Sequence, residues 1–414
     1  TIAQVVKGAL NIYGGTFKVS LNKYTDANGE ASYLLNCSDT PYKNGEAVIN
    51  VYGGTFYKFN PENNAAEGIG TNFCAEYHST KKDGDYYTVV APTVNEYVVP
   101  SEITLDGNTV IIKNATADYG VVVSGNGTVC FENVTIKPNS GNGITLADNS
   151  NVTLTGCNLT VVAAEGGAIS GSVTIDNFNG LTAEANCTLE NVEQHIANGI
   201  SGYSHYYGIG SDKAKVKIQN SIIEYAKGAH VQPNFEFDKK YGKAEPEGSP
   251  AIGGVEITID NSTIKKADGG SKAAAIGAAY WNNTKISILN STILEANGGN
   301  ASAGIGGSRY RNSITESDKQ SCIILIENST VTATGGEGGA GIGSGYDTHC
   351  AANSTNAVND IKIINSTITA KGGKYAAGIG TGFHAAALTG SIDAASKIIA
   401  TSGEITGEKN LLKR

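Results

Sequence analysis

Four copies of one alternating pattern of apolar and polar residues run through the C-terminal half of the chain. Each copy ends in Asn-Ser-Thr, as in Ile361-Lys-Ile-Ile-Asn-Ser-Thr-Ile368, and is followed by a Gly-Gly pair and a small-residue Ile-Gly motif. Alternation with period two predicts β-strands, and the Gly and Asn residues predict tight turns between them. The repeated asparagines are Asn261, Asn290, Asn328 and Asn365, and the isoleucines are Ile276, Ile305, Ile342 and Ile379.

The two halves of this repeat differ in how much their length varies. Each asparagine is followed by the next such isoleucine after 14 or 15 residues, whereas the isoleucines are followed by the next asparagine after 14, 23 and 23 residues. We therefore expect strands and turns of fixed length, with loops of variable length on one flank. These loops are expected at about 279–284, 307–321 and 344–360, with a longer one at about 228–249.

Weaker copies of the strand-Asn pattern precede the four clear ones. Asn177 fits the pattern but lies only 14 residues before Asn191, so one of these two must lie on a different face. The spacings vary too much for a propeller and have no helical period, but a coil of three short strands per turn tolerates such variation. The earlier copies end at Asn114, Asn133, Asn158, Asn191 and Asn220.

These patterns predict an all-β fold, a right-handed parallel β-helix (β-solenoid), over about residues 101–400. Each turn has too few Val and Ile residues to bury them alone, so the turns must stack. Asparagine amides can then hydrogen-bond along the stack, and glycine pairs permit the positive φ angles of corners. The predicted asparagine ladder consists of Asn220, Asn261, Asn290, Asn328 and Asn365.

The N-terminal 91 residues contain a duplication of their own. Asn11-Ile-Tyr-Gly-Gly-Thr-Phe17 returns 39 residues later as Asn50-Val-Tyr-Gly-Gly-Thr-Phe56, and each copy predicts a strand, a glycine kink and a second strand. We expect a β-rich region at 1–91, which could also be a β-helix, followed by a linker at 92–100. The polar segment after Ile398 is expected to cap or leave the coil, with a tail at 401–414.

Composition excludes some classes of function. The net charge is −9 without a Lys/Arg cluster, which argues against nucleic-acid binding, and no apolar run is long enough to insert in a membrane. Because the chain lacks Met, we expect that a signal peptide or larger upstream region has been removed. The seven cysteines contain no CxxC pair. Cys322 and Cys350 could pair, but buried free thiols are the favoured interpretation.

The Asn-Ser-Thr copies also match the acceptor signal for N-glycosylation. An asparagine in an internal ladder could not carry a glycan, and we favour the structural role.

Rare residues gather just after the Ile-Gly motifs, where the variable loops begin. Stacked turns would align them into a column with the only Trp and two of the three Arg, and aromatic faces beside Arg and Asp suit sugar rings. The alternative is that the column stacks on itself and folds the loops onto the coil. The candidate ligand-binding residues are Tyr280, Trp281, Arg309, Tyr310, Arg311, Tyr346, Asp347, Phe383 and His384.

The sequence pattern gives less support for catalysis. A glycosidase needs two carboxylates beside one bond, and no acidic pair recurs in the loops. The weak candidates are Glu316 and Asp318, near Arg309 and Arg311, against Asp347 and His349 on the next turn. The six His show no metal-ligand spacing, so we expect neither a metal nor another cofactor.

Two segments resemble known proteins. The repeat at 361–382, Ile-x-Ile-x-Asn-Ser-Thr-Ile with Gly-Gly and Ala-Gly-Ile-Gly-x-Gly, resembles repeats of large secreted or surface β-helix proteins of gut bacteria. Val51-Tyr-Gly-Gly-Thr-Phe-Tyr-Lys-Phe-Asn-Pro, with Tyr86-Tyr-Thr-Val-Val, is similar to segments of β-helical proteins of gut bacteria and their tailed phages. The resemblance implies an exposed, glycan-facing protein and carries over no catalytic residue.

Three functions follow as hypotheses. The first is a non-enzymatic recognition protein, an adhesin or phage receptor-binding component, that binds a glycan or cell-surface receptor. The second is a polysaccharide depolymerase, either a lyase or a glycoside hydrolase. The third is a structural spacer in a fibre or coat. We expect an extracellular, cell-surface or virion-associated protein, which would be a homotrimer if it derives from a phage and a monomer otherwise.

Overall fold

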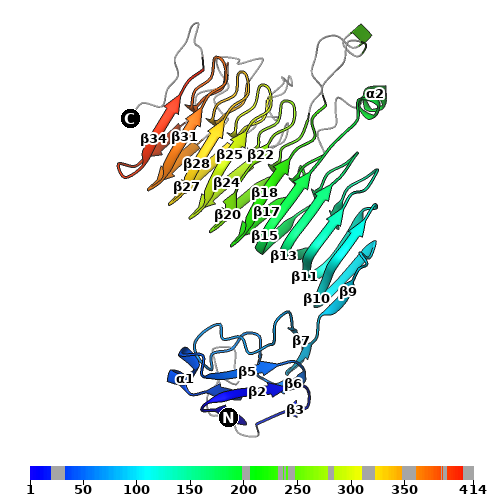
Figure 1. Ribbon diagram of the computed structural model, residues 1–414. Coiled ribbons are helices and arrows are strands. Elements are labelled where there is room, and N and C mark those ends of the chain that lie inside the picture. Colours follow the sequence, from blue (N-terminus) through cyan, green and yellow to red (C-terminus); the bar gives the residue numbers. More distant parts are fainter. Residues whose placement is uncertain are drawn as a thin grey trace. The chain divides into compact units, whose positions relative to one another are not determined.

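The computed structural model describes two compact units built almost entirely of β-strands (Figure 1). Thr1–Asn95, Thr104–Ile111 and Gly125–Cys130 form the N-terminal unit. Glu96–Ile103, Ile112–Ser124 and Phe131–Arg414 form the second, which we call the solenoid unit. The described residues are 1–19, 33–197, 206–231, 236, 239–240, 248–277, 284–309, 322–346, 360–383, 385 and 389–403.

The N-terminal duplication folds into two stacked turns. Its two copies lie side by side as parallel strands, with Asn11 opposite Asn50 and Phe17 opposite Phe56. An antiparallel hairpin, β7–β8, extends the sheet beyond β6. The elements are β1 (Ala3–Val5), β2 (Gly8–Ile12), β3 (Thr16–Phe17), β4 (Leu35–Cys37), α1 (Asp39–Lys43), β5 (Ala47–Val51), β6 (Gly54–Tyr57), β7 (Ser79–Asp83), β8 (Tyr86–Val90) and β9 (Thr93–Glu96).

The solenoid unit is a parallel β-helix with three sheets. Sheet one contains the Ile-Gly strands, each paired in parallel with its counterpart one turn on. Four long strands turn a corner and serve two sheets: β10 (Glu102–Ala117), β11 (Val121–Ile136), β13 (Asn151–Val162) and β15 (Val173–Glu184). The sheet-one strands are β12 (Ile144–Leu146), β14 (Ile169–Ser170), β16 (Ile209–Gly210), β19 (Ile252–Gly253), β23 (Ile276–Gly277), β26 (Ile305–Gly306), β29 (Ile342–Gly343) and β32 (Ile379–Gly380).

Sheets two and three lie before and after the asparagine corner of each turn. Sheet two continues the first part of β13 and β15 as β17 (Lys215–Gln219), β20 (Glu256–Asp260), β24 (Thr284–Leu289), β27 (Cys322–Glu327), β30 (Asp360–Ile364) and β33 (Thr389–Ile392). Sheet three continues their second part as β18 (Ile222–Lys227), β21 (Thr263–Ile264), β22 (Ala267–Asp268), β25 (Thr292–Asn297), β28 (Thr330–Thr334), β31 (Thr367–Lys371) and β34 (Lys397–Thr401).

The core consists of aliphatic stacks, as the pattern predicted. The isoleucines of successive Ile-Gly motifs are paired from turn to turn, from Ile276 to Ile379, and each is no more than 3% exposed. Sheet two adds a second stack, which includes Ile259, Ile288 and Ile326. Each turn therefore buries its few β-branched side chains only against its neighbours, which is why the turns are stable as a stack.

The asparagines form a ladder at the surface of the corner, not inside the coil. Each has a positive φ, between 44° and 56° for Asn114, Asn133, Asn158, Asn177, Asn220, Asn261, Asn290, Asn328 and Asn365. The Asn365 amide donates to Asn328 Oδ1 at 2.8 Å, and Asn328 donates to Asn290 at 3.3 Å. Two steps use aspartate instead, because Asn220 donates to Asp176 and Asn290 donates to Asp260.

We expect Asn328→Ala to lower the free energy of unfolding by roughly 2 kcal/mol, because alanine is strained at positive φ and lacks the ladder amide. Asn328→Gly removes the same amide but tolerates the φ of 50°, so it should cost less. Urea unfolding of both variants separates the two contributions. Equal losses for alanine and glycine would contradict a role for the backbone conformation.

A second ladder, of serines that are buried except for the half-buried Ser396 at its end, runs directly beside the first. The N–H of each of the first five serines donates to the Oγ of the serine one turn on, at 3.0 to 3.1 Å. The hydroxyls of the same five serines donate at 2.5 to 2.7 Å to the carbonyl two residues earlier along the chain. This arrangement explains the Ser of Asn-Ser-Thr, because each hydroxyl accepts a serine N–H of the preceding turn that would otherwise be buried without a partner. The serines are Ser221, Ser262, Ser291, Ser329, Ser366 and Ser396.

The predicted role of the glycine pairs is wrong. Gly299, Gly336 and Gly373 do not have positive φ angles, whereas the corner asparagines do. A Cβ on each would instead lie 1.7 to 1.9 Å from the carbonyl oxygen of the equivalent glycine in the preceding turn. The glycines are required because the backbones of neighbouring turns approach too closely for any side chain.

Two further expectations need correction. Asn191 lies in helix α2 (Leu189–Ala197) and not at a strand end, which leaves the corner position to Asn177. The polar segment after Ile398 does not leave the coil at once, because β34 pairs in parallel with β31 as far as Thr401. Here backbone hydrogen bonds to the preceding turn suffice to hold a strand with an exposed Ile399.

The cysteines in the described part of the chain lie in both units and belong to no group that could hold a metal ion. Cys37, Cys74, Cys157 and Cys187 are free thiols, and burial raises the pKa of Cys74 and Cys187 to about 12. Cys350 lies outside the described residues, so its suggested pairing with Cys322 stays a prediction.

Candidate functional site

Three of the predicted ligand-binding residues come together on one flank of sheet one. The Arg309 guanidinium lies 5.8 Å from the Tyr346 ring centroid, and the Tyr346 and Phe383 rings stack at 5.5 Å with an interplanar angle of 20°. We call these three residues the aromatic column. Tyr375 packs against its end, with its ring 5.1 Å from that of Phe383.

A repeated backbone hydrogen bond holds the aromatic column against the coil. The N–H groups of Arg309, Tyr346 and Phe383 donate to the carbonyls of Lys272, Ala301 and Gly338, respectively, each in a turn before an Ile-Gly strand. The side chains are half-buried, and the Tyr346 ring lies directly over Gly338. The described part of the column therefore packs on itself and on the coil, which fits the structural alternative. Arg309 Nε is buried and has no hydrogen-bond partner among the residues that the structure describes.

The other candidates lie outside the described residues. This applies to the ligand-binding candidates Tyr280, Trp281, Tyr310, Arg311, Asp347 and His384, and to the weak catalytic candidates Glu316, Asp318 and His349. The variable loops 307–321 and 344–360 likewise fall mostly in this part of the chain.

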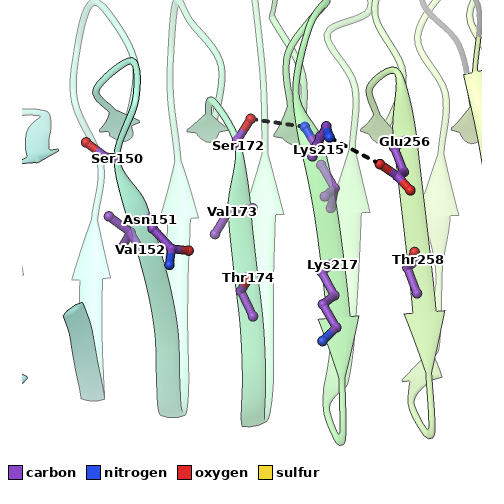
Figure 2. Close-up of a pocket in the computed structure, with 11 residues that line it drawn as sticks. Ser150, Asn151, Val152, Ser172, Val173, Thr174, Lys215, Lys217, Glu256 and Thr258 are labelled. Atoms are coloured by element: carbon purple, nitrogen blue, oxygen red, sulfur yellow. Dashed lines mark hydrogen bonds and ion pairs between the residues drawn. The ribbon is translucent and has the colours of Figure 1, made fainter. Parts of the chain in front are cut away.

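The structure adds a site that the sequence did not indicate, a groove on the outer face of sheet two. Its volume is about 420 Å³, and it crosses four successive strands, β13, β15, β17 and β20 (Figure 2). We call it the sheet-two groove. It is lined by Ser150, Asn151, Val152, Ser172, Val173, Thr174, Lys215, Val216, Lys217, Glu256 and Thr258.

Strand alternation places the polar side chains of the groove in rows. Thr174, Lys217 and Thr258 occupy one register position on neighbouring strands, one step from the buried valines Val173 and Val216. Because the inward valines are fixed in the core, the outward residues between them are held at a regular spacing of about 4.8 Å per strand. The groove is thus a rigid polar surface that crosses the strands.

The groove contains more positively charged than negatively charged side chains. Lys215 Nζ lies 3.6 Å from Glu256 Oε2, and the Lys215 N–H donates to Ser172 Oγ at 3.0 Å, as Figure 2 shows. Lys217 is exposed on the same strand and forms no ion pair with the described residues. The groove therefore carries a net positive charge on a chain whose overall charge is −9. Such a position favours an anionic group on a bound molecule.

A second polar cluster lies on sheet three. Tyr225 Oη donates to Asp268 Oδ2 at 2.9 Å, Lys266 Nζ lies 3.1 Å from the same oxygen, and the Asn297 amide donates to Asp268 Oδ1. Burial, and then the hydrogen bond to Asp268, raise the pKa of Tyr225, while the hydrogen bond to Asp268 raises that of Lys266. Both groups stay protonated at neutral pH, and their bonds to Asp268 hold neighbouring turns together.

Comparison with protein-family models, with curated proteins and with solved structures gave no match. The class of the protein therefore rests on its own architecture, an all-β parallel β-helix with a groove on one sheet. In the part of the chain that the structure describes, no helix is long and apolar enough to span a membrane. The same residues contain no group of three or more His, Cys, Asp or Glu side chains arranged to hold a metal ion.

Proposed function

We propose that this protein is a non-enzymatic recognition protein that holds an extended glycan in the sheet-two groove. The observation that carries the proposal is the groove itself, a polar surface that repeats its hydrogen-bonding groups over four turns of a rigid coil. A polymer with a repeating unit can use such a surface several times over. Several weak contacts, each to one sugar unit, then combine to give a higher overall affinity.

The lining chemistry supports a polysaccharide over a peptide. Hydroxyl groups of Ser172, Thr174 and Thr258 and the amide of Asn151 can donate to and accept from sugar hydroxyls. The lining contains no aromatic ring or exposed aliphatic pocket of the kind that anchors a peptide. Lys217 adds an ammonium group, which suits the carboxylate of an acidic sugar.

The groove fits binding better than hydrolysis. Glycoside hydrolysis uses two carboxyl groups on either side of the bond that is cleaved. Among the residues that line the groove, Glu256 is the single carboxylate, and it is paired with Lys215. A depolymerase that acts in this groove would lack the second carboxyl group.

The biological setting extends this proposal. The resemblance of the repeats to surface β-helix proteins of gut bacteria and their phages supports an extracellular, cell-surface or virion-associated adhesin or receptor-binding component. A phage component of this kind would be a homotrimer, and a bacterial adhesin would be a monomer. Sedimentation equilibrium of the full chain distinguishes these two states.

We expect Lys217→Glu to weaken binding to acidic polysaccharides by roughly tenfold or more, because it reverses the charge in the groove. The measurement is biolayer interferometry of the full chain with immobilised polygalacturonate, alginate and hyaluronate, repeated at rising salt. A salt-dependent affinity that Lys217→Glu reduces supports the proposal.

The matched control is Lys362→Glu. Lys362 is exposed and occupies the register position of Lys217 on the same sheet, but four strands further along and outside the groove. Equal losses in the two variants would show a general charge effect. Absence of binding to all three acidic polysaccharides would contradict the proposal.

A further inference from the structure

Two tyrosines of the N-terminal duplication form an exposed stack. Tyr13 and Tyr52 occupy equivalent positions in the two stacked turns, and their rings lie 4.9 Å apart with an interplanar angle of 16°. Tyr13 is 73% exposed and Tyr52 is 38% exposed. Aromatic side chains at this level of exposure are unusual, because burying a ring normally stabilises the fold.

The exposure of Tyr13 shows which part of the ring is open. One face of Tyr13 lies against Tyr52, so a side chain that is still 73% exposed must present its other face to solvent. Tyr52 is fixed from a second direction, because His78 meets its ring edge-on at 5.5 Å and 88°. The stack is therefore a supported aromatic surface with an open end.

The neighbouring pair Phe17 and Phe56 shows that exposure is not a requirement of the duplication. These rings stack at 4.8 Å in the same way, but Phe56 is fully buried and belongs to the core of the unit. Both pairs lie in the same repeated Tyr-Gly-Gly-Thr-Phe segment. The phenylalanine pair thus contributes to the core of the unit, whereas the tyrosine pair leaves ring surface in water.

Uncharged hydrogen-bonding groups lie beside the open ring. Asn11 precedes Tyr13 by two residues, so both project on the side opposite the buried Ile12. The Asn50 amide donates to Asn11 Oδ1 at 2.9 Å, which fixes the two amides relative to each other. One amide N–H2 and one amide carbonyl of this pair form no other side-chain hydrogen bond among the described residues.

We propose that Tyr13, supported by Tyr52 and flanked by Asn11 and Asn50, binds a pyranose ring of a neutral glycan. The apolar C–H face of a sugar would extend the stack on the open face of Tyr13, and its hydroxyls would meet the asparagine amides. Charged side chains are absent from the four residues of this site, so it selects neutral sugars, in contrast to the sheet-two groove. This site is independent of the groove and does not rest on the function proposed for it.

The test uses the full chain and neutral hexasaccharides of glucose, mannose, galactose and xylose as probes. Saturation-transfer difference NMR detects which probe binds, and titration gives its dissociation constant. We expect Tyr13→Ala to weaken that binding by roughly tenfold and Tyr13→Phe to retain it, because the ring and not the hydroxyl makes the contact.

Tyr97→Ala is the matched control, since Tyr97 is 71% exposed and stacks on no ring in the described part of the chain. It should bind the neutral probe as the parent does. Binding that Tyr13→Ala leaves unchanged, or no binding of any of the four probes at millimolar concentration, would overturn this site. If polygalacturonate binding still depends on Lys217 in that case, the Tyr13 site is refuted while the proposal for the sheet-two groove is not.

Discussion

Gly336→Ala is expected to lower the free energy of unfolding of the solenoid unit by roughly 4 kcal/mol or more, or to prevent folding. Gly336 has no positive φ, so backbone strain is not the cause. The new Cβ would lie 1.9 Å from the Gly299 carbonyl oxygen and 2.5 Å from its carbon. Both atoms belong to the backbone of the preceding turn, so no side chain can move aside, and the stacked turns must separate locally.

The comparison is Gly307→Ala, measured in the same urea-unfolding experiment. Gly307 also has an ordinary φ, but the nearest heavy atom to its added Cβ is 3.1 Å away, so only a small adjustment is required. We expect this variant to lose clearly less stability than Gly336→Ala. Equal effects would show that the close approach of neighbouring turns is not what selects glycine.

Ser291→Ala is expected to lower the free energy of unfolding by roughly 2 to 3 kcal/mol, because it leaves the buried Ser262 N–H without a partner and removes the hydroxyl bond to Leu289. The Ser291 hydroxyl accepts from the Ser262 N–H at 3.0 Å and donates to the Leu289 carbonyl at 2.5 Å. Ser291 is only 4% exposed, so water cannot replace the lost oxygen without opening the corner.

The control for the serine ladder is Ser287→Ala, in the same strand β24. Ser287 lies at an outward position and is half-buried, so loss of its hydroxyl should change the stability by less than about 0.5 kcal/mol. Urea unfolding of the two variants compares one serine-to-alanine change inside the ladder with one outside it. Similar stabilities would contradict the role of the buried hydroxyl.

The fold could be predicted because its stabilising residues repeat in the sequence. The period-two strands and the regularly placed isoleucines predicted the stacked sheets, and the core stack through Ile276, Ile305 and Ile342 confirms that reasoning. The role of the Gly-Gly pairs was not predictable in the same way. A glycine required by close approach looks the same in a sequence as one required by positive φ, and only the distance between neighbouring backbones distinguishes the two.

The serine ladder could have been predicted from the repeated Ser, but that residue was interpreted only as part of a glycosylation motif. Ser follows the asparagine in all four clear copies, at Ser262, Ser291, Ser329 and Ser366, and a repeated small polar residue beside a corner is typical of a buried hydrogen bond. The prediction for Asn191 was wrong because a local pattern was trusted too far. Its local pattern matches a strand end, but the amphipathic segment Leu189–Ala197 forms a helix, so tertiary context overrode the pattern.

The candidate sites were harder to predict than the fold. The sequence pointed to the aromatic column, because rare residues stand out in an alignment of repeats, and its described members pack against each other. The sheet-two groove consists of common residues such as Thr174, Lys217 and Thr258, which no motif marks. The Tyr13–Tyr52 pair was visible as a repeat, but its exposure depends on how the two turns stack and on what covers them.

The glycan that we propose as the ligand would lie across β13, β15, β17 and β20. The most direct measurement is a crystal structure of the full chain with hexameric oligogalacturonate. We expect sugar density along the sheet-two groove, with a carboxylate in hydrogen-bonding contact with Lys217 Nζ. Density confined to another face of the coil, with the groove left to solvent, would contradict it.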